Sequence, residues 1–153
     1  MATRVILFYA IAGSGKSWLS IMLADQNPGS YILSKDDFRT KNGVYKFDPS
    51  SEPDIEKEYF DMLEGFLLSK KHSLLILDNT HLSPAFYRKS VCLFNKYNIV
   101  FLTIAITPLN NINKHLSLNV HNLDVTDIER QKKDWFENKD ELLNVIYFAH
   151  HLA

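Results

Sequence analysis

The sequence predicts an α/β fold in which helices cover both faces of a mostly parallel sheet of four to five strands. Wholly apolar runs alternate with amphipathic stretches along the chain. The run at 73–78 is typical of a parallel strand buried on both faces. Strands that alternate with helices, joined by right-handed crossovers, form a three-layer α/β/α sandwich.

Each element is predicted from its periodicity and its flanking residues. Strands are expected at residues 4–9, 31–33, 73–78 and 99–106. Helices are expected at residues 17–24, 55–69, 84–97, 109–118 and from 126 to about 136. The pair Asn42-Gly43 predicts a small hairpin or tight turn, and residues 49–53 and 119–125 read as loops. Residues 140–150 form a last apolar-rich element that the pattern leaves open between helix and strand.

The loop after the first strand reads Ala-Ile-Ala-Gly-Ser-Gly-Lys-Ser from Ala10 to Ser17. Between a strand and a helix, this is the pattern of a phosphate-binding loop, or P-loop, whose backbone N–H groups cradle the phosphates of a nucleotide. It predicts a P-loop NTPase fold in which Lys16 reaches the β- and γ-phosphates and Ser17 ligates Mg²⁺. The residues expected to bind the nucleotide are Ala12, Gly13, Ser14, Gly15, Lys16, Ser17 and Trp18. The usual leading glycine is Ala10 here, which narrows the backbone freedom of that position.

Two more polar segments follow strands and are expected at the same rim of the sheet. Asp78 ends an apolar strand and is expected to hold Mg²⁺ opposite the Ser17 hydroxyl. Either Asp36 or Asp37 would accept the proton of an acceptor hydroxyl, and Arg39 would grip an acceptor phosphate. The competing interpretation is that these aspartates only cap helices or stabilise turns.

Residues 13–17 (Gly-Ser-Gly-Lys-Ser), 33–39 (Leu-Ser-Lys-Asp-Asp-Phe-Arg) and 77–84 (Leu-Asp-Asn-Thr-His-Leu-Ser-Pro) together resemble the P-loop kinase domain of the polynucleotide 5′-hydroxyl kinase family, including its bacteriophage members. The resemblance covers nearly the whole chain, and residues 42–48 are similar to a branch in which Asp-Asp-Phe precedes Gly-x-Tyr-x-Phe.

The resemblance implies roles for individual residues. It places the donor-binding lysine and hydroxyl at Lys16 and Ser17, the general base at Asp36 and the substrate-binding arginine at Arg39. The group that orients this arginine or the metal falls on Asp78 or Asn79. The residues expected on the substrate side are Asp37, Arg39, Asn79 and Thr80.

The family's lid carries arginines for the donor phosphates, commonly as Arg-Asn-x-His, and this chain departs from it. Residues 118–121 read Leu-Asn-Val-His, and residues 113–125 contain no arginine. Loss of a cationic finger can cost on the order of 10³ to 10⁵ in turnover unless another cation replaces it. The nearby candidates are Lys114, His115, His121 and Arg130.

The sequence therefore predicts an ATP- and Mg²⁺-dependent kinase that phosphorylates the 5′-hydroxyl of DNA or RNA, with a nucleotide donor and a nucleic-acid 5′ end as its partners. Two alternatives remain. Residues 40–53 would form the acceptor pocket and do not settle the acceptor, so a small-molecule or nucleoside kinase also fits. Ala10 and the arginine-free lid also fit a nucleotide-binding regulatory module with weak catalysis.

Length and composition limit the number of domains and the classes of function that these hypotheses can include. With 153 residues and 46% hydrophobic residues, the chain is expected to form a single P-loop kinase domain over residues 1–153. The formal net charge of −1 argues against broad adhesion to nucleic acid but leaves room for a local basic groove. The lone Cys92, the missing signal-peptide pattern and the lack of a membrane-length apolar run lead us to expect a cytoplasmic protein. Trp18 and Trp135 are expected to serve packing.

Overall fold

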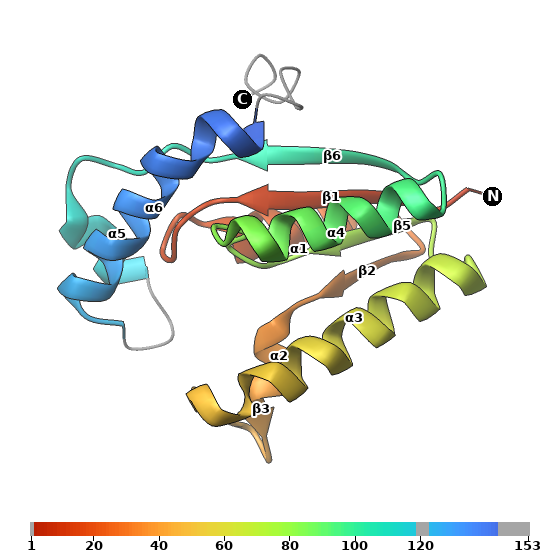
Figure 1. Ribbon diagram of the computed structural model, residues 1–153, viewed down its shortest axis with the longest axis horizontal. Helices are drawn as coiled ribbons and strands as arrows, with labels where there is room; N and C mark the ends of the chain where they lie inside the picture. Colours follow the sequence, from red (N-terminus) through yellow and green to blue (C-terminus); the bar gives the residue numbers. More distant parts are fainter. Residues whose placement is uncertain (1, 119–122, 144–153) are drawn as a thin grey trace.

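The computed structural model describes residues 2–118 and 123–143. Its centre is a four-stranded parallel sheet with the strand order β2-β5-β1-β6 (Figure 1). The strands are β1 (Arg4–Tyr9), β2 (Ser30–Leu33), β5 (Leu74–Leu77) and β6 (Val100–Ala105). Each lies within one or two residues of its predicted position, and the predicted fold class is confirmed.

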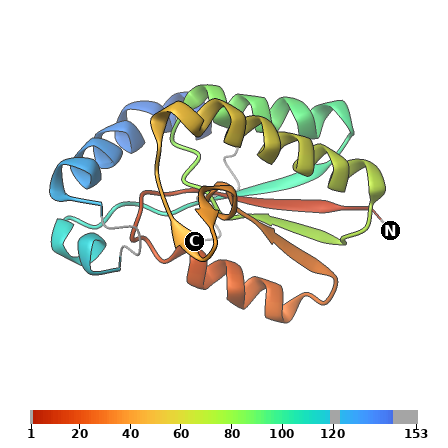
Figure 2. The same ribbon diagram turned by 90° about the horizontal axis from the view of Figure 1, so that it is seen from below.

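Helices cover both faces of the sheet, as Figure 2 shows. One face carries α1 (Lys16–Gln26), and the other carries α3 (Glu52–Ser69), α4 (Pro84–Lys96) and α6 (Val125–Leu143). Successive side chains of a strand point to opposite faces, so Leu7 and Tyr9 join the core under α3, α4 and α6, whereas Phe8 joins the core under α1. The three predicted layers are therefore present.

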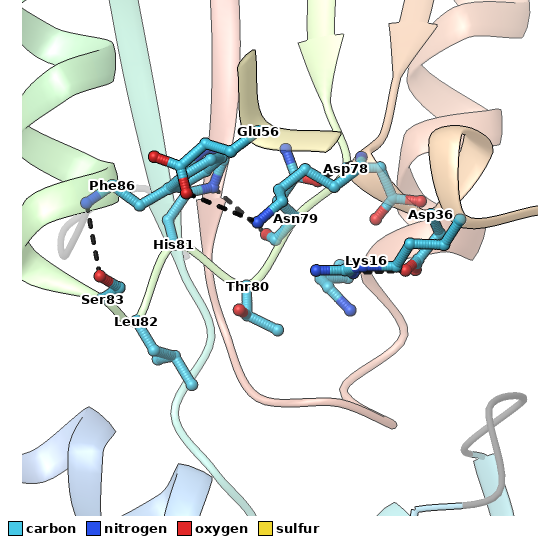
Figure 3. Close-up of a pocket in the computed structure, with 12 residues that line it drawn as sticks. Lys16, Asp36, Glu56, Asp78, Asn79, Thr80, His81, Leu82, Ser83 and Phe86 are labelled. Atoms are coloured by element: carbon cyan, nitrogen blue, oxygen red, sulfur yellow. Dashed lines mark hydrogen bonds and ion pairs between the residues drawn. The ribbon is translucent and has the colours of Figure 1, made fainter. Parts of the chain in front are cut away.

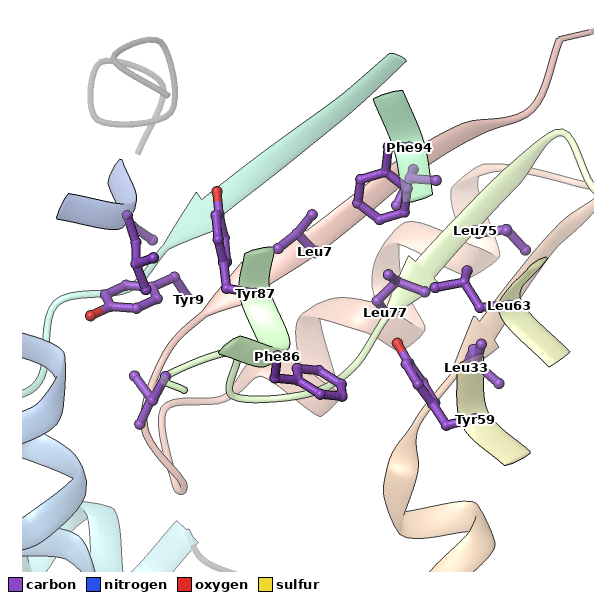
Figure 4. Close-up of a cluster of buried hydrophobic side chains, with 14 of the residues drawn as sticks. Leu7, Tyr9, Leu33, Tyr59, Leu63, Leu75, Leu77, Phe86, Tyr87 and Phe94 are labelled. Carbon is purple, nitrogen blue, oxygen red and sulfur yellow. The ribbon is translucent and has the colours of Figure 1, made fainter. Parts of the chain in front are cut away.

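The larger core, shown in Figure 4, ties α6 to the end of β1. The Tyr9 hydroxyl donates to the Trp135 carbonyl oxygen at 2.7 Å, and the Trp135 indole N–H donates to the Tyr9 carbonyl oxygen at 3.2 Å. Burial raises the pKa of Tyr9, so its hydroxyl stays a donor. The packing role expected for Trp135 is confirmed. Trp18 is 67% exposed, so the same expectation for Trp18 is wrong.

Helix α6 is longer than predicted because Leu142 and Leu143 continue its buried face into the core. The first four residues of the segment left open at 140–150 are thus helical, and the rest lies outside the described residues. Helix α5 (Ile112–Leu118) begins three residues later than predicted. Of the predicted loop at 119–125, residues 119–122 also lie outside the described residues.

Between β2 and α3 the chain forms a small insertion. It consists of α2 (Lys35–Arg39), the strands β3 (Thr40–Lys41) and β4 (Val44–Tyr45), and a 3₁₀ turn, η1 (Pro49–Ser51). Asn42 and Gly43 take positive φ values of 53° and 75°, as a two-residue hairpin turn requires, so the predicted hairpin is confirmed.

The loop predicted at 49–53 is wrong. Asp48 caps the 3₁₀ turn through its side chain, and α3 follows at once from Glu52, because proline is tolerated in the first turn of a helix, where Pro53 lies. Within the described ranges, no helix combines the length and the apolar character needed to cross a membrane.

Candidate active site

The P-loop folds around two glycines with left-handed backbone. Gly13 and Gly15 have φ values of 71° and 82°, and α1 begins directly after Gly15. A Cβ atom on Gly13 would lie 2.0 Å from the carbonyl oxygen of His115. The loop is therefore packed against α5, and Gly13 cannot be replaced without moving one of the two backbones.

The two alanines of the loop are held by neighbouring elements. Ala10 lies outside the positive-φ region, its N–H donates to the Thr80 carbonyl oxygen at 3.1 Å, and its methyl group is fully buried under α1. Alanine thus fits the leading P-loop position without strain. The Ala12 N–H donates to Gln131 Oε1 at 2.8 Å, so α6 engages this loop amide.

A pocket of about 190 Å³ lies at the carboxyl ends of the central strands, beside Lys16 (Figure 3). Six of the residues expected in the site line it: Lys16, Asp36, Arg39, Asp78, Asn79 and Thr80. Of the other residues expected in the site, Asp37 is exposed and outside the lining, and Ser17 is exposed at the start of α1. The sheet rim therefore brings the three predicted segments together.

Unsatisfied polar atoms concentrate at this rim. Among the described residues, three buried side-chain atoms have no hydrogen-bond partner: Ser14 Oγ, Asp78 Oδ1 and His81 Nε2. Burial lowers the pKa of the Lys16 amine, and the carboxylates of Asp78 and Asp36 oppose this shift. Because buried polar atoms in proteins are nearly always paired, a loop hydroxyl and a carboxylate left open beside a lysine fit a bound ligand.

On the other side of Lys16, Asp36 belongs to a network around Arg39. The Arg39 guanidinium donates to Asp36 Oδ1 at 2.8 Å and makes a bidentate contact with Glu52, in which Nε donates to Oε2 at 3.2 Å and Nη2 donates to Oε1. Burial disfavours the charge on Arg39, but Glu52 and then Asp36 outweigh it, so the pKa of the guanidinium is raised. Arg39 is thus fixed in place as a cation.

Backbone contacts hold α2 so that Asp36 faces the pocket. The N-cap of α2 is Ser34, whose hydroxyl accepts from the Asp36 N–H at 3.2 Å, so neither aspartate is the cap. Asn79 Oδ1 accepts from the Lys35 N–H at 2.8 Å, and Asn79 Nδ2 donates to the Tyr59 hydroxyl at 2.9 Å. Since both ends of its amide are engaged, Asn79 joins α2 and α3 to the end of β5.

Sequence reasoning did not find Lys35, Glu52, Glu56 and His81, of which all but Glu52 line the pocket. Lys35 Nζ lies 3.9 Å from Glu56 and 4.9 Å from the centre of the Phe86 ring. Burial lowers the pKa of Lys35, and the carboxylates of Glu52 and Glu56 oppose this shift. The sequence did offer one indication for Lys35, because it directly precedes the Asp36-Asp37 pair that was assigned to the site. Glu52 was hidden because its segment read as a loop.

His81 is neutral and points one nitrogen at main-chain oxygens. Its Nδ1 lies 2.8 Å from the Phe8 carbonyl oxygen and 3.3 Å from that of Asn79. Two acceptors require the proton on Nδ1, which leaves Nε2 unprotonated. Burial lowers the pKa of His81 to about 4, with further lowering by Lys16 and Lys35. The ring therefore ties the segment after β5 to β1 and keeps an open acceptor beside the pocket.

Of the four replacement cations considered for the lid, Lys114 is exposed on α5, and His115 and Arg130 are engaged with other groups. His115 Nε2 accepts from the Leu109 N–H at 2.8 Å and its Nδ1 lies 3.1 Å from the Gly13 carbonyl oxygen, so the ring is a neutral link between α5 and the P-loop. Arg130 is paired with Asp127 at 3.4 Å. His121 lies outside the described residues.

No cluster of three His, Cys, Asp or Glu side chains within the described ranges is arranged to hold a metal ion. A divalent ion here would depend on few protein ligands, such as the open Asp78 oxygen, together with phosphate oxygens of the nucleotide. Mg²⁺ is commonly bound in this way, through one or two carboxylates, water and substrate phosphates. The residues present therefore fit the ion.

The strand order, the P-loop and the carboxylate at the end of β5 define the P-loop kinase fold. Residues 5–117 match the family described as AAA domain, and the chain belongs to this family. Human NEDD4-binding protein 2 is 34% identical over 99 residues, which are 63% of this chain and 6% of that protein.

Solved structures extend the likeness at the level of fold. A chain of the Pnkp1/Rnl/Hen1 RNA repair complex matches with a TM-score of 0.75 at 16% identity, over 92% of this chain and 46% of that one. Shikimate kinase from Acinetobacter baumannii matches with a TM-score of 0.57 at 14% identity, over 95% of this chain and 81% of that one. The same fold thus occurs in a nucleic-acid repair complex and in a small-molecule kinase.

Proposed function

We propose that the chain is an ATP- and Mg²⁺-dependent kinase that transfers the γ-phosphate to the 5′-hydroxyl of DNA or RNA. The observation that carries the proposal is the pairing of Asp36 with Arg39 on the wall of the pocket that also contains Lys16 and Asp78. A carboxylate and a fixed cation beside a nucleotide site are the two groups that an anionic acceptor with a hydroxyl needs.

In this proposal Asp36 takes the proton of the 5′-hydroxyl as its oxygen bonds to the γ-phosphorus. The bond from that phosphorus to the β–γ bridging oxygen breaks, ADP leaves, and Asp36 releases the proton to solvent. Lys16 stabilises the charge on the transferred group and on the leaving oxygen. Arg39 holds the phosphate that follows the acceptor nucleoside, which orients the hydroxyl.

On the donor side, the amides of residues 13–17 and the N-terminus of α1 face the phosphates. The open Ser14 hydroxyl would donate to a phosphate oxygen, and Ser17 and Asp78 would hold Mg²⁺, which supplies charge neutralisation when bound. Trp18 is exposed next to Ser17, and we expect its ring to contact the bound nucleotide.

The decisive experiment offers γ-labelled ATP and Mg²⁺ with a 5′-hydroxyl oligonucleotide, a nucleoside, or no acceptor. Label on the oligonucleotide alone supports the proposal. Label on the nucleoside alone contradicts it and favours a small-molecule kinase, and ATP binding with no transfer favours a regulatory module.

A Lys16→Met variant serves as the donor-side control. Removal of this one cation from a preorganised site is expected to lower transfer by about 10² to 10³ and to weaken ATP binding. Unchanged ATP affinity and transfer in this variant would place the donor elsewhere.

A further inference from the structure

A second cavity, of about 290 Å³, lies against the hairpin and opens beside the active site. Arg39 lines both cavities, so it separates the hairpin groove from the pocket that holds Lys16 and Asp36. Figure 1 shows the hairpin at the tip of the insertion, next to α2 and the start of α3. A molecule bound at Arg39 can therefore extend from the active site into this hairpin groove.

The hairpin groove is lined by cations, by apolar side chains and by Asp48. Lys41 and Lys46 flank it, and the apolar part is formed by Phe38, Val44 and Ile55. Both lysines are exposed. Phe47, the next residue after Lys46, is 56% exposed and packs near Arg39, whose guanidinium carbon lies 5.7 Å from the ring centre.

The two lysines of the groove lack the ion pairs that several other lysines of the chain make. Within the described residues, neither Lys41 nor Lys46 has a carboxylate oxygen within ion-pair distance. By contrast, the amines of five other lysines lie within 4.0 Å of a carboxylate oxygen: Lys35, Lys57, Lys89, Lys96 and Lys133.

The acid nearest in sequence is already engaged. The Asp48 carboxylate accepts from the Ser50 N–H at 3.0 Å and from the hydroxyls of Ser50 and Ser51 at 2.8 and 3.0 Å. Asp48 therefore serves the turn that starts α3. The hydrogen bonds from Ser50 and Ser51 lower the pKa of Asp48, and Lys46 lies close enough to add to this shift. Neither Lys41 nor Lys46, however, forms an ion pair within 4.0 Å among the described residues.

We infer that the hairpin groove binds the sugar-phosphate chain of a single-stranded acceptor beyond its first nucleotide, an inference that rests on the proposed function. Exposed lysines along a groove, next to Arg39, match the phosphates, and the apolar lining and the exposed Phe47 ring suit the flat faces of bases. The hairpin groove would thus make the enzyme prefer a polynucleotide to a free nucleoside.

The test compares the Lys41→Ala/Lys46→Ala double variant with a control, Lys96→Ala/Lys133→Ala. The control removes the same charge from lysines outside both cavities. Binding of a fluorescent single-stranded 5′-hydroxyl oligonucleotide is followed by anisotropy across a KCl series. The slope of log K for oligonucleotide binding against log salt is negative, and each phosphate contact contributes about 0.7 to its magnitude. Loss of two contacts should therefore reduce that magnitude by about 1.4 in the hairpin variant. The control variant should keep the slope of the wild type.

Steady-state transfer gives an independent readout. The hairpin variant should show a higher KM for the oligonucleotide and an unchanged kcat/KM for a nucleoside 3′-phosphate, a short acceptor that reaches Arg39 but does not extend into the hairpin groove. Equal salt slopes in the hairpin variant and the wild type would overturn the inference, as would equal losses for both acceptors. Because binding is measured without transfer, a protein that binds through the hairpin but phosphorylates nothing would refute the proposed function and leave the groove assignment standing.

Discussion

The donor side and the acceptor side of the site are built in opposite ways. The donor side consists of a backbone loop between β1 and α1, and it leaves Ser14 Oγ and the nearby Asp78 Oδ1 without partners. The acceptor side consists of side chains on α2 and α3, where Arg39 already bonds to Asp36 and Glu52. The nucleotide would therefore complete an open site, whereas the acceptor would join a network that exists before it binds.

The strongest test of this difference is Asp36→Asn against Asp37→Asn. Loss of a general base lowers turnover by about 10² to 10⁴, so Asp36→Asn should nearly abolish transfer while ATP still binds. Asp37 is exposed and outside the pocket lining, so its variant should keep most of the activity.

Single-turnover transfer and equilibrium binding of ATP separate the two effects. Full activity in Asp36→Asn would show that this carboxylate is not the base. A matching loss in both variants would show that the charge of the pair matters more than the position of either group.

A second test concerns His81, which lies between the two sides. Because its pKa is lowered to about 4 from an ordinary 6.5, the unfolded chain binds more protons between these values. The free energy of unfolding should thus fall by about 3 kcal/mol as the pH drops from 6.5 to 4. His81→Asn removes this titration, keeps an N–H donor for the Phe8 carbonyl and suits the positive φ of 52°.

Urea unfolding at several pH values measures this difference. Carboxyl groups in general also titrate near about pH 4. The quantity to compare is therefore the slope of the unfolding free energy against pH in the wild type minus the same slope in His81→Asn. Identical slopes would mean that the buried ring takes up a proton without cost.

The same contrast explains what the sequence could predict. Strand periodicity and the glycine positions determined β1, the P-loop and the meeting of residues 10–17, 36–39 and 78–80 at one rim. The pairing of Arg39 with Glu52 could not be foreseen, because the two residues are separated by the hairpin and the segment around Pro53 was predicted to be a loop. His115 as a neutral link was also hidden, since both of its partners are main-chain groups.

Glu52→Gln tests how far the acceptor side depends on that pairing. The variant keeps the size of the side chain and removes the charge that fixes Arg39. Hydrogen bonds to charged groups contribute about 1.5 to 3 kcal/mol, and since glutamine retains one acceptor, we expect the KM of the oligonucleotide to rise about tenfold with little change in kcat or in the KM of ATP.

Glu58→Gln is the matched control, because Glu58 is exposed on the same helix and lies outside the pocket. A fall in kcat without a change in KM would indicate that Glu52 acts through Asp36 and not by positioning Arg39.

The smallest effect is expected at Ala10, on the donor side. In sequence Ala10 departs from the P-loop pattern, but its methyl group packs under α1 on backbone that needs no glycine. Ala10→Gly should lower the free energy of unfolding by about 0.5 to 1 kcal/mol, which is a drop of about 1 to 4 °C in Tm for a chain of this length, and should leave the KM of ATP unchanged. Thermal melts and ATP kinetics on the same preparation decide the matter. If glycine instead improved ATP affinity several-fold, the backbone at position 10 would restrict ATP binding. The donor loop would then not be an open site that the nucleotide completes, and the contrast with the acceptor side would fail.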